Sequence, residues 1–165
     1  MRTTKVADKD YTGSRYMGIS WDMFHRDART LAARLMPRGP FSGIVAISRG
    51  GLVPAAVVAR ELNLRLVDTL CVASYDDRVQ GDDALVLKAP AGDGEGWLVI
   101  DDLVDSGRTG KVVRRLLPKA TFATVYAKPQ GQALVDEFVV AVDQHIWLLF
   151  PWDAEMQPSP PLAGA

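Results

Sequence analysis

Two short, uninterrupted apolar runs place the strongest constraint on the fold of this chain, namely GIVAIS (43–48) and WLVI (97–100). A run without polar alternation is typical of a strand that is covered on both faces. Each run is followed at once by a polar, glycine-containing loop and then by a helical pattern. Strands that alternate with helices indicate a parallel sheet with helices on both sides. We therefore expect an α/β fold with a doubly wound, mainly parallel twisted sheet.

The other apolar patterns predict further elements of the same kind. Apolar residues recur at steps of three and four from Trp21 to Leu35, which predicts an amphipathic helix that Ser20 caps and Pro37 ends. Residues 76–95 lose this periodicity, so we expect a long excursion there with room for a hairpin. The remaining predicted elements are helices over 52–63 and 109–117 and strands over 65–74, 121–128, 138–142 and 146–150.

Composition suits one globular domain over residues 1–165. Of its 165 residues, 48% are hydrophobic, and the formal net charge of −1 gives no overall field toward nucleic acid or anionic lipid. The single cysteine, Cys71, fits a reducing cytosol, and no stretch approaches the roughly 18 apolar residues of a membrane span. We expect a cytoplasmic protein with a loose leading segment over 1–18, a Pro-rich tail over 154–165, and no nucleic-acid partner.

The loop after WLVI carries most of the chemistry. It reads DDLVDSGRTG (101–110) and combines carboxylates with glycines and hydroxyls. Residues 106–109 can turn backbone N–H groups and two hydroxyls toward an anion at the positive end of the next helix. The loop lacks the GKT or GKS of a Walker loop and the spacing of a GxGxxG loop. Asp101 and Asp102 would repel a phosphate, so we expect them to face sugar hydroxyls or a divalent cation.

The same loop resembles a known family motif. VIDDLVDSGRT (99–109) is similar to the phosphoribosyl-pyrophosphate binding motif of the type I phosphoribosyltransferases. The resemblance extends over roughly residues 20 to 153, to bacterial members that act on 6-oxopurines, through SRGGLVPAAVVAREL (48–62), ASYDD (73–77), Lys128-Pro129, LVDEFVV (134–140) and PWD (151–153). It implies purine salvage: Mg²⁺-dependent transfer of ribose 5-phosphate from phosphoribosyl pyrophosphate to N9 of guanine or xanthine, and more weakly hypoxanthine. The products would be GMP, XMP or IMP, and pyrophosphate.

The resemblance also implies roles for individual residues. Asp105 would be the general base near the purine N7, while Asp101 and Asp102 would accept the ribose hydroxyls, and Asp102 would also bind Mg²⁺. The peptide bond between Arg49 and Gly50 is expected to be cis. The residues implied for phosphoribosyl pyrophosphate are Ser48, Arg49, Gly50, Asp101, Asp102, Leu103, Val104, Asp105, Ser106, Gly107, Arg108 and Thr109.

On the purine side, the resemblance implies five contacts. Lys128 would donate to the purine O6, which separates 6-oxopurines from adenine because an ammonium group cannot accept. Trp147 would stack on the ring, the Leu148 carbonyl and Asp153 would meet the exocyclic 2-position, and Asp105 would face N7. The preference among guanine, xanthine and hypoxanthine stays open.

Each of these features has a simpler interpretation. The carboxylates could form a solvated turn in which Asp105 or Ser106 caps the helix. Gly50 could belong to an ordinary turn, Lys128 could be an exposed lysine, and Trp147 could be a core residue. For the pyrophosphate contact within 76–95, two candidates remain, Arg78 and Lys88.

Two alternative functions are compatible with the same motif. One is a non-enzymatic regulator of this fold that senses phosphoribosyl pyrophosphate, and the other is a phosphoribosyltransferase for another base, such as adenine. The resemblance further implies a homotetramer, a small hood built from the terminal segments, and peripheral contact with the cytoplasmic side of the inner membrane. His25 and His145 are isolated in the sequence, without other potential zinc ligands at a suitable spacing, so no zinc site is expected.

Overall fold

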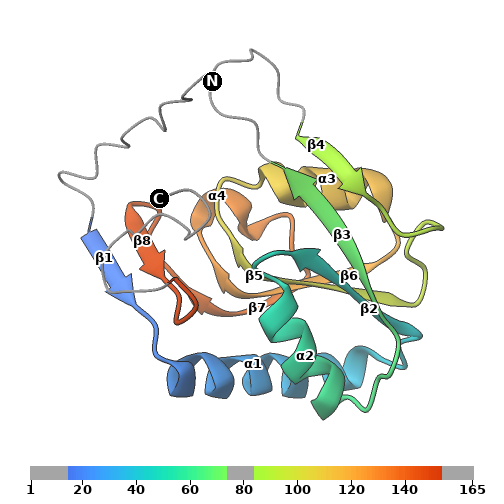
Figure 1. Ribbon diagram of the computed structural model, residues 1–165, viewed down its shortest axis with the longest axis horizontal. Helices are drawn as coiled ribbons and strands as arrows, with labels where there is room; N and C mark the ends of the chain where they lie inside the picture. The colour runs from blue at the N-terminus through green and yellow to red at the C-terminus, as the bar shows by residue number, and fades with distance from the viewer. Residues whose placement is uncertain (1–14, 74–83, 154–165) are drawn as a thin grey trace, which may run out of the picture.

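The computed structural model describes residues 15–73 and 84–153. Their elements, in chain order, are β1 (Arg15–Gly18), α1 (Trp21–Leu35), the 3₁₀ helix η1 (Met36–Arg38), β2 (Gly43–Ser48), α2 (Leu52–Glu61), β3 (Val67–Ala73), β4 (Leu85–Lys88), β5 (Trp97–Val104), α3 (Arg108–Leu116), β6 (Thr121–Ala127), α4 (Pro129–Gln132), β7 (Glu137–Ala141) and β8 (Ile146–Leu149) (Figure 1). Strands and helices alternate through most of the chain, as the sequence predicted.

A six-stranded sheet in the order β4-β3-β2-β5-β6-β7 forms the centre of the molecule. All neighbouring strands are parallel except β3 and β4, which are antiparallel. The helices α1 and α2 lie on one side of this sheet and α3 on the other (Figure 1). The predicted fold class, a doubly wound and mainly parallel sheet, is confirmed.

Alternating side chains of the central strands pack into two separate hydrophobic cores, one on each face of the sheet. In β2, Ile44 and Ala46 pack with α1 and α2, whereas Val45 and Ile47 pack with Val113 of α3. Both faces of the strand are therefore covered, which explains why its sequence is apolar without alternation.

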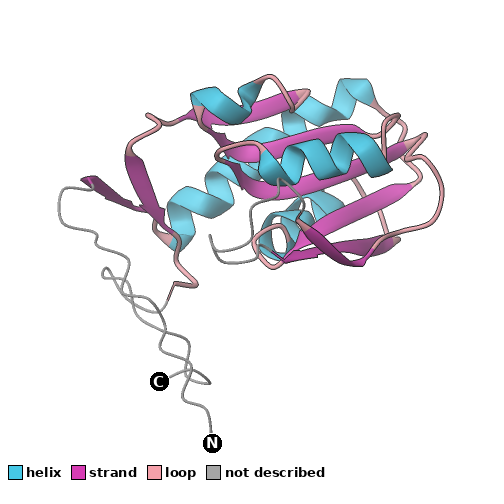
Figure 2. Ribbon diagram, turned by 90° about the horizontal axis from the view of Figure 1, so that it is seen from above, coloured by secondary structure: helices cyan, strands magenta, loops and turns pink. Residues whose placement is uncertain are grey.

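A separate two-stranded sheet pairs the two ends of the described chain. β1 and β8 run parallel, with Tyr16 opposite Trp147, and Ile19 N donates to Leu149 O at 2.9 Å. Figures 1 and 2 show this pair to one side of the central sheet, in the position of the expected hood. Residues 15–18 were expected within a loose segment; the prediction was wrong for them because their backbone pairs with a strand more than 100 residues away.

The third predicted strand also differs from expectation, because β5 continues past Ile100 to Val104. Its pairing with β6 extends through Asp101 opposite Thr124 and Val104 opposite Ala127. Backbone pairing therefore holds the two acids in an extended strand, where a turn was expected. Consecutive side chains of a strand point to opposite faces, so Asp101 and Asp102 face different sides of the sheet.

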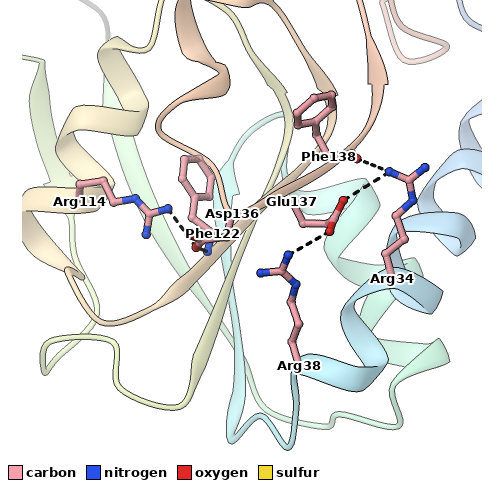
Figure 3. A network of polar contacts seen from close by, with 7 residues as sticks. All are labelled: Arg34, Arg38, Arg114, Phe122, Asp136, Glu137 and Phe138. Carbon is pink, nitrogen blue, oxygen red and sulfur yellow. Dashed lines mark hydrogen bonds and ion pairs between the residues drawn. The ribbon is translucent and has the colours of Figure 1, made fainter.

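Polar contacts fix the edge strand β7 from both sides. Figure 3 shows Arg34 and Arg38 on either side of Glu137, at 3.3 Å and 3.2 Å from its two carboxylate oxygens. On the other side of the strand, Arg114 lies 2.9 Å from Asp136, whose carboxylate also accepts from Phe122 N at 2.7 Å. These contacts hold the start of β7 against α1 on one side and α3 on the other.

Within residues 15–73 and 84–153, no helix combines the length and the apolar composition needed to cross a membrane.

Candidate active site

The loops that follow β2, β5 and β6 meet at one edge of the sheet, because these parallel strands are neighbours and their carboxyl ends point the same way. In α/β sheets this edge is the usual place for a ligand. The loops contain, respectively, Arg49 to Gly51, Asp105 to Gly107, and Lys128 with the start of α4. The sequence-predicted residues on these loops are therefore brought together.

The SRGG loop lies directly against β5. A Cβ atom on Gly50 would lie 2.3 Å from Oδ2 of Asp102, and one on Gly51 would lie 2.3 Å from the carbonyl oxygen of Ile100. Gly51 thus approaches a neighbouring backbone, and Gly50 approaches the side chain of Asp102, more closely than a residue with a Cβ could. Arg49, which precedes Gly50 in this loop, is exposed.

The cis peptide bond in this loop joins Ser48 and Arg49. The bond between Arg49 and Gly50 was expected to be cis, so that prediction was wrong by one residue. Nothing in the SRGG sequence distinguishes the two bonds.

Asp101 and Asp102 form an acidic pair near the end of β5, in which Asp101 is buried and Asp102 is half-buried. Burial, followed by the neighbouring charge of Asp102, raises the pKa of Asp101 well above its ordinary value, and Asp101 is 8% exposed. Burial also raises the pKa of Asp102 to about 6. Neighbouring backbone groups use part of the hydrogen-bond-accepting capacity of the two carboxylates. Asp102 N donates to Oδ1 of Asp101 at 3.0 Å, and Leu103 N donates to Oδ1 of Asp102 at 2.7 Å. A ligand that brings hydroxyl donors or positive charge would stabilise both acids in their ionised form.

The turn into α3 matches the geometry of an anion site. Gly107 adopts φ 84° and begins the helix, and no side chain caps it. The simpler interpretation, in which Asp105 or Ser106 caps the helix, is therefore wrong. Gly107 is packed tightly, because a Cβ there would lie 2.7 Å from Cδ1 of Leu134. The first N–H groups of α3, at the positive end of the helix, have no side-chain cap. Ser106 and Arg108 are exposed beside them.

Asp105 is held by two side chains from other loops. Lys128 Nζ donates to its Oδ2 at 3.0 Å, and Gln144 Nε2 donates to its Oδ1 at 2.9 Å. Lys128 is only 4% exposed, so the interpretation as an exposed lysine is wrong. Sequence reasoning missed Gln144, because a lone glutamine in the loop between two strands carries no signal of its own.

Three of the residues expected to contact the purine, Trp147, Leu148 and Asp153, lie in or just after β8. Trp147 is 39% exposed on β8, and Leu148 is buried. Asp153 accepts from Phe150 N at 2.9 Å, and its charge also contributes to the raised pKa of Asp102, after burial. The carboxylate of Asp153 is therefore near enough to Asp102 for the two charges to repel each other.

Aromatic contacts attach this segment to the body of the molecule. The rings of Phe150 and Trp152 stack with centroids 4.8 Å apart, and Trp152 meets Phe24 of α1 edge-on at 4.9 Å. The packing of Trp152 against α1 thus helps to hold the neighbouring Asp153 in place.

Of the two residues considered for pyrophosphate, the structure describes only Lys88, which lies away from the site. Lys88 donates to Asp68 and, at 3.0 Å, to the carbonyl oxygen of Thr69 near the start of β3, away from the carboxyl ends of the strands. Arg78 lies outside the described residues. His25 and His145 are both exposed.

Comparison with known proteins agrees with this geometry. The phosphoribosyl transferase domain family matches residues 20–159. The chain is 59% identical over 146 residues to xanthine-guanine phosphoribosyltransferase from Desulfotalea psychrophila, covering 88% of this chain and 91% of that relative. It is 54% identical to the protein of the same name from Nitratidesulfovibrio vulgaris strain DP4, covering 93% of this chain and 96% of that relative. The chain belongs to the xanthine-guanine phosphoribosyltransferase family of enzymes.

Solved structures support the fold of this phosphoribosyltransferase. A purine phosphoribosyltransferase from Pyrococcus horikoshii superposes with a TM-score of 0.71 at 24% identity, covering 83% of this chain and 93% of that one. A Helicobacter pylori xanthine-guanine-hypoxanthine phosphoribosyltransferase gives 0.70 at 23%, covering 85% and 95%. The expected family and purine-salvage enzyme class are confirmed by the relatives, against the alternative of a sensing regulator.

Proposed function

We propose that this phosphoribosyltransferase joins guanine or xanthine, and hypoxanthine more weakly, to the ribose 5-phosphate of phosphoribosyl pyrophosphate. The reaction forms the bond between N9 and C1 of the ribose, breaks the bond between C1 and the pyrophosphate oxygen, and releases pyrophosphate. GMP, XMP or IMP is the product. The observation that carries the proposal is the position of Asp105, which lies between the uncapped turn of α3 and the buried ammonium group of Lys128.

Phosphoribosyl pyrophosphate would bind across the loops after β2 and β5. The turn at 106–109 would offer uncapped N–H groups and hydroxyls to the 5-phosphate, and the exposed Arg49 would contact the pyrophosphate. As pyrophosphate leaves, positive charge develops on the ribose. The carboxylates of Asp101 and Asp102 would accept the ribose hydroxyls and stabilise that charge.

The residues present also fit Mg²⁺. No group of three or more potential ligands from His, Cys, Asp and Glu occurs among the described residues. This suits a cation that takes one or two carboxylates and completes its coordination with substrate oxygens and water. Asp102 would hold the ion, which would supply charge neutralisation for the pyrophosphate.

The purine would enter between the hood and the end of β6. Lys128 would donate to O6, Trp147 would stack on the ring, and the Leu148 carbonyl with Asp153 would meet the 2-position. The proton on N7 would pass to Asp105, which lies 3.0 Å from Lys128 and can therefore reach a ring whose O6 contacts that lysine.

Purified protein incubated with Mg²⁺, phosphoribosyl pyrophosphate and each purine tests the proposal. We expect nucleotide and pyrophosphate from guanine and xanthine, less IMP from hypoxanthine, and no AMP from adenine. Turnover of adenine alone would indicate a phosphoribosyltransferase for another base. Omission of Mg²⁺ in the presence of a chelator should abolish turnover.

Assembly and location are further parts of the proposal. We expect a homotetramer, which light scattering coupled to size-exclusion chromatography measures directly. We also expect the protein in the cytoplasm with some peripheral contact with the inner membrane, which sedimentation with anionic vesicles at low and high salt would detect.

A further inference from the structure

The side chain of Gln144 joins two loops of the active site. It lies in the connection between β7 and β8, 39 residues from Asp105 in sequence, and its Nε2 donates to Oδ1 of Asp105 at 2.9 Å. Its Oε1 accepts from the backbone N–H of Gln130 at 3.1 Å, in the first turn of α4. Both polar atoms of the amide are thus used, each on a different loop.

These partners determine the orientation of the amide. A backbone N–H can only donate, so the atom of Gln144 that faces Gln130 must be the oxygen. The NH₂ group must then face Asp105, which accepts as a carboxylate. The opposite orientation would place a donor against a donor and an oxygen against an oxygen.

The connection that carries Gln144 is itself a tight turn. His145 N donates to Oδ1 of Asp143 at 2.9 Å, and Ile146 N donates to the carbonyl oxygen of Asp143 at 3.1 Å. Because the backbone is fixed on both sides of Gln144, the side chain is directed toward Asp105 by a defined turn.

The Asp105 carboxylate needs a second contact to fix its orientation, because it is partly exposed to solvent. Its side chain is 47% exposed, and Lys128 holds only one of its two oxygens. A carboxylate with one donor can rotate about that contact, whereas donors on both oxygens fix the plane of the group. The unused lone pairs then point in one direction, toward the position that a proton donor would occupy.

We propose that Gln144 is a positioning residue, which orients the Asp105 carboxylate for proton transfer and links it to the strand that carries Trp147. The proposal rests on the proposed role of Asp105 as general base. Gln144 does not need to touch the purine. Its turn leads directly into β8, so the orientation of the base and the position of the stacking platform depend on one short connection.

Two variants test the proposal. Gln144→Met keeps the size of the side chain and removes both polar atoms, while Gln144→Glu keeps the acceptor for Gln130 and replaces the donor with an oxygen. We expect kcat to fall roughly 10-fold in Gln144→Met and further in Gln144→Glu, because a misdirected catalytic group loses rate through geometry. KM for phosphoribosyl pyrophosphate should change less than about twofold, since uniform binding is untouched.

The control is Gln130→Ala, which removes an exposed side chain from the same cluster and keeps the backbone N–H that Gln144 accepts from. It should retain wild-type kcat. All three variants should remain folded, with thermal midpoints close to wild type, because Gln130 is exposed and Gln144 is only partly buried. Wild-type kcat in both Gln144 variants would overturn the proposal.

A double-mutant cycle distinguishes the positioning role of Gln144 from the general-base role of Asp105 on which it rests. If Gln144 acts through Asp105, then Gln144→Met should lower kcat in wild type and have no further effect in the Asp105→Ala background. A full additional loss in that background would overturn the positioning role. If Asp105→Ala alone leaves kcat unchanged, the assignment of Asp105 as general base fails. If Asp105→Ala lowers kcat but the Gln144 variants keep the wild-type kcat, that assignment stands and the positioning role of Gln144 fails.

Discussion

Gly50→Ala is the sharpest test of the contact between the SRGG loop and the acidic pair. The new Cβ would lie 2.3 Å from Oδ2 of Asp102 and 2.5 Å from its Cγ, whereas ordinary van der Waals contacts begin at 3.4 Å. Either the carboxylate or the loop must therefore move by about 1 Å. A displacement of about 1 Å at a catalytic group lowers the rate by roughly 100-fold. We therefore expect kcat/KM for phosphoribosyl pyrophosphate to fall by about two orders of magnitude, with overpacking that lowers the unfolding free energy by about 1–3 kcal/mol.

The assay combines steady-state kinetics with urea denaturation. Gly39→Ala is the matched control, because a Cβ there has its closest contacts at 3.5 Å and the backbone has an ordinary φ of −76°. The double variant Gly50→Ala/Asp102→Ala removes the atoms that clash, so it should recover much of the lost stability without recovering activity. Wild-type kcat/KM in Gly50→Ala would refute the reasoning, and so would a double variant no more stable than the single one.

Three further predictions follow from the same contacts. Tyr126→Phe should lower the unfolding free energy by about 1–3 kcal/mol in urea denaturation, since the buried Asp27 carboxylate loses its 2.9 Å hydrogen bond from the tyrosine; an unchanged midpoint would contradict this. Burial raises the pKa of Asp102 to about 6, so its ionisation opposes folding and stability should fall as pH rises from 4 to 7. Asp102→Asn should therefore stabilise the protein at pH 8 more than at pH 5, and equal effects would count against it. Lys128→Met should raise KM for guanine at least 10-fold and KM for phosphoribosyl pyrophosphate much less; the reverse pattern would remove Lys128 from the purine side.

Local patterns were sufficient to predict most of the fold. The strand over 43–48 and the Ser20 cap of α1, which accepts from Met23 N at 3.2 Å, follow from signals contained within a few residues. β1 and the extension of β5 did not follow, because each depends on pairing with a distant strand that overrides local composition.

The candidate site divides in the same way. Acids, glycines and hydroxyls within one loop form a motif, so Asp101 to Thr109 could be selected from the sequence. Gln144 and the burial of Lys128 depend on how three connections meet in space, and no spacing in the chain encodes that meeting.

The acidic pair lowers the stability of the fold at the carboxyl end of β5. Two adjacent acids in a strand of the sheet, both with raised pKa, are less favourable for folding than apolar residues would be. The pairing of β5 with β6 nevertheless holds them in place, and a glycine on the neighbouring loop leaves room for the carboxylate of Asp102. An asparagine at position 102 should therefore give a more stable protein and a poorer enzyme. If stability and activity instead rose together in that variant, the pair would have no role in binding ribose or metal, and its place at the end of β5 would need another explanation.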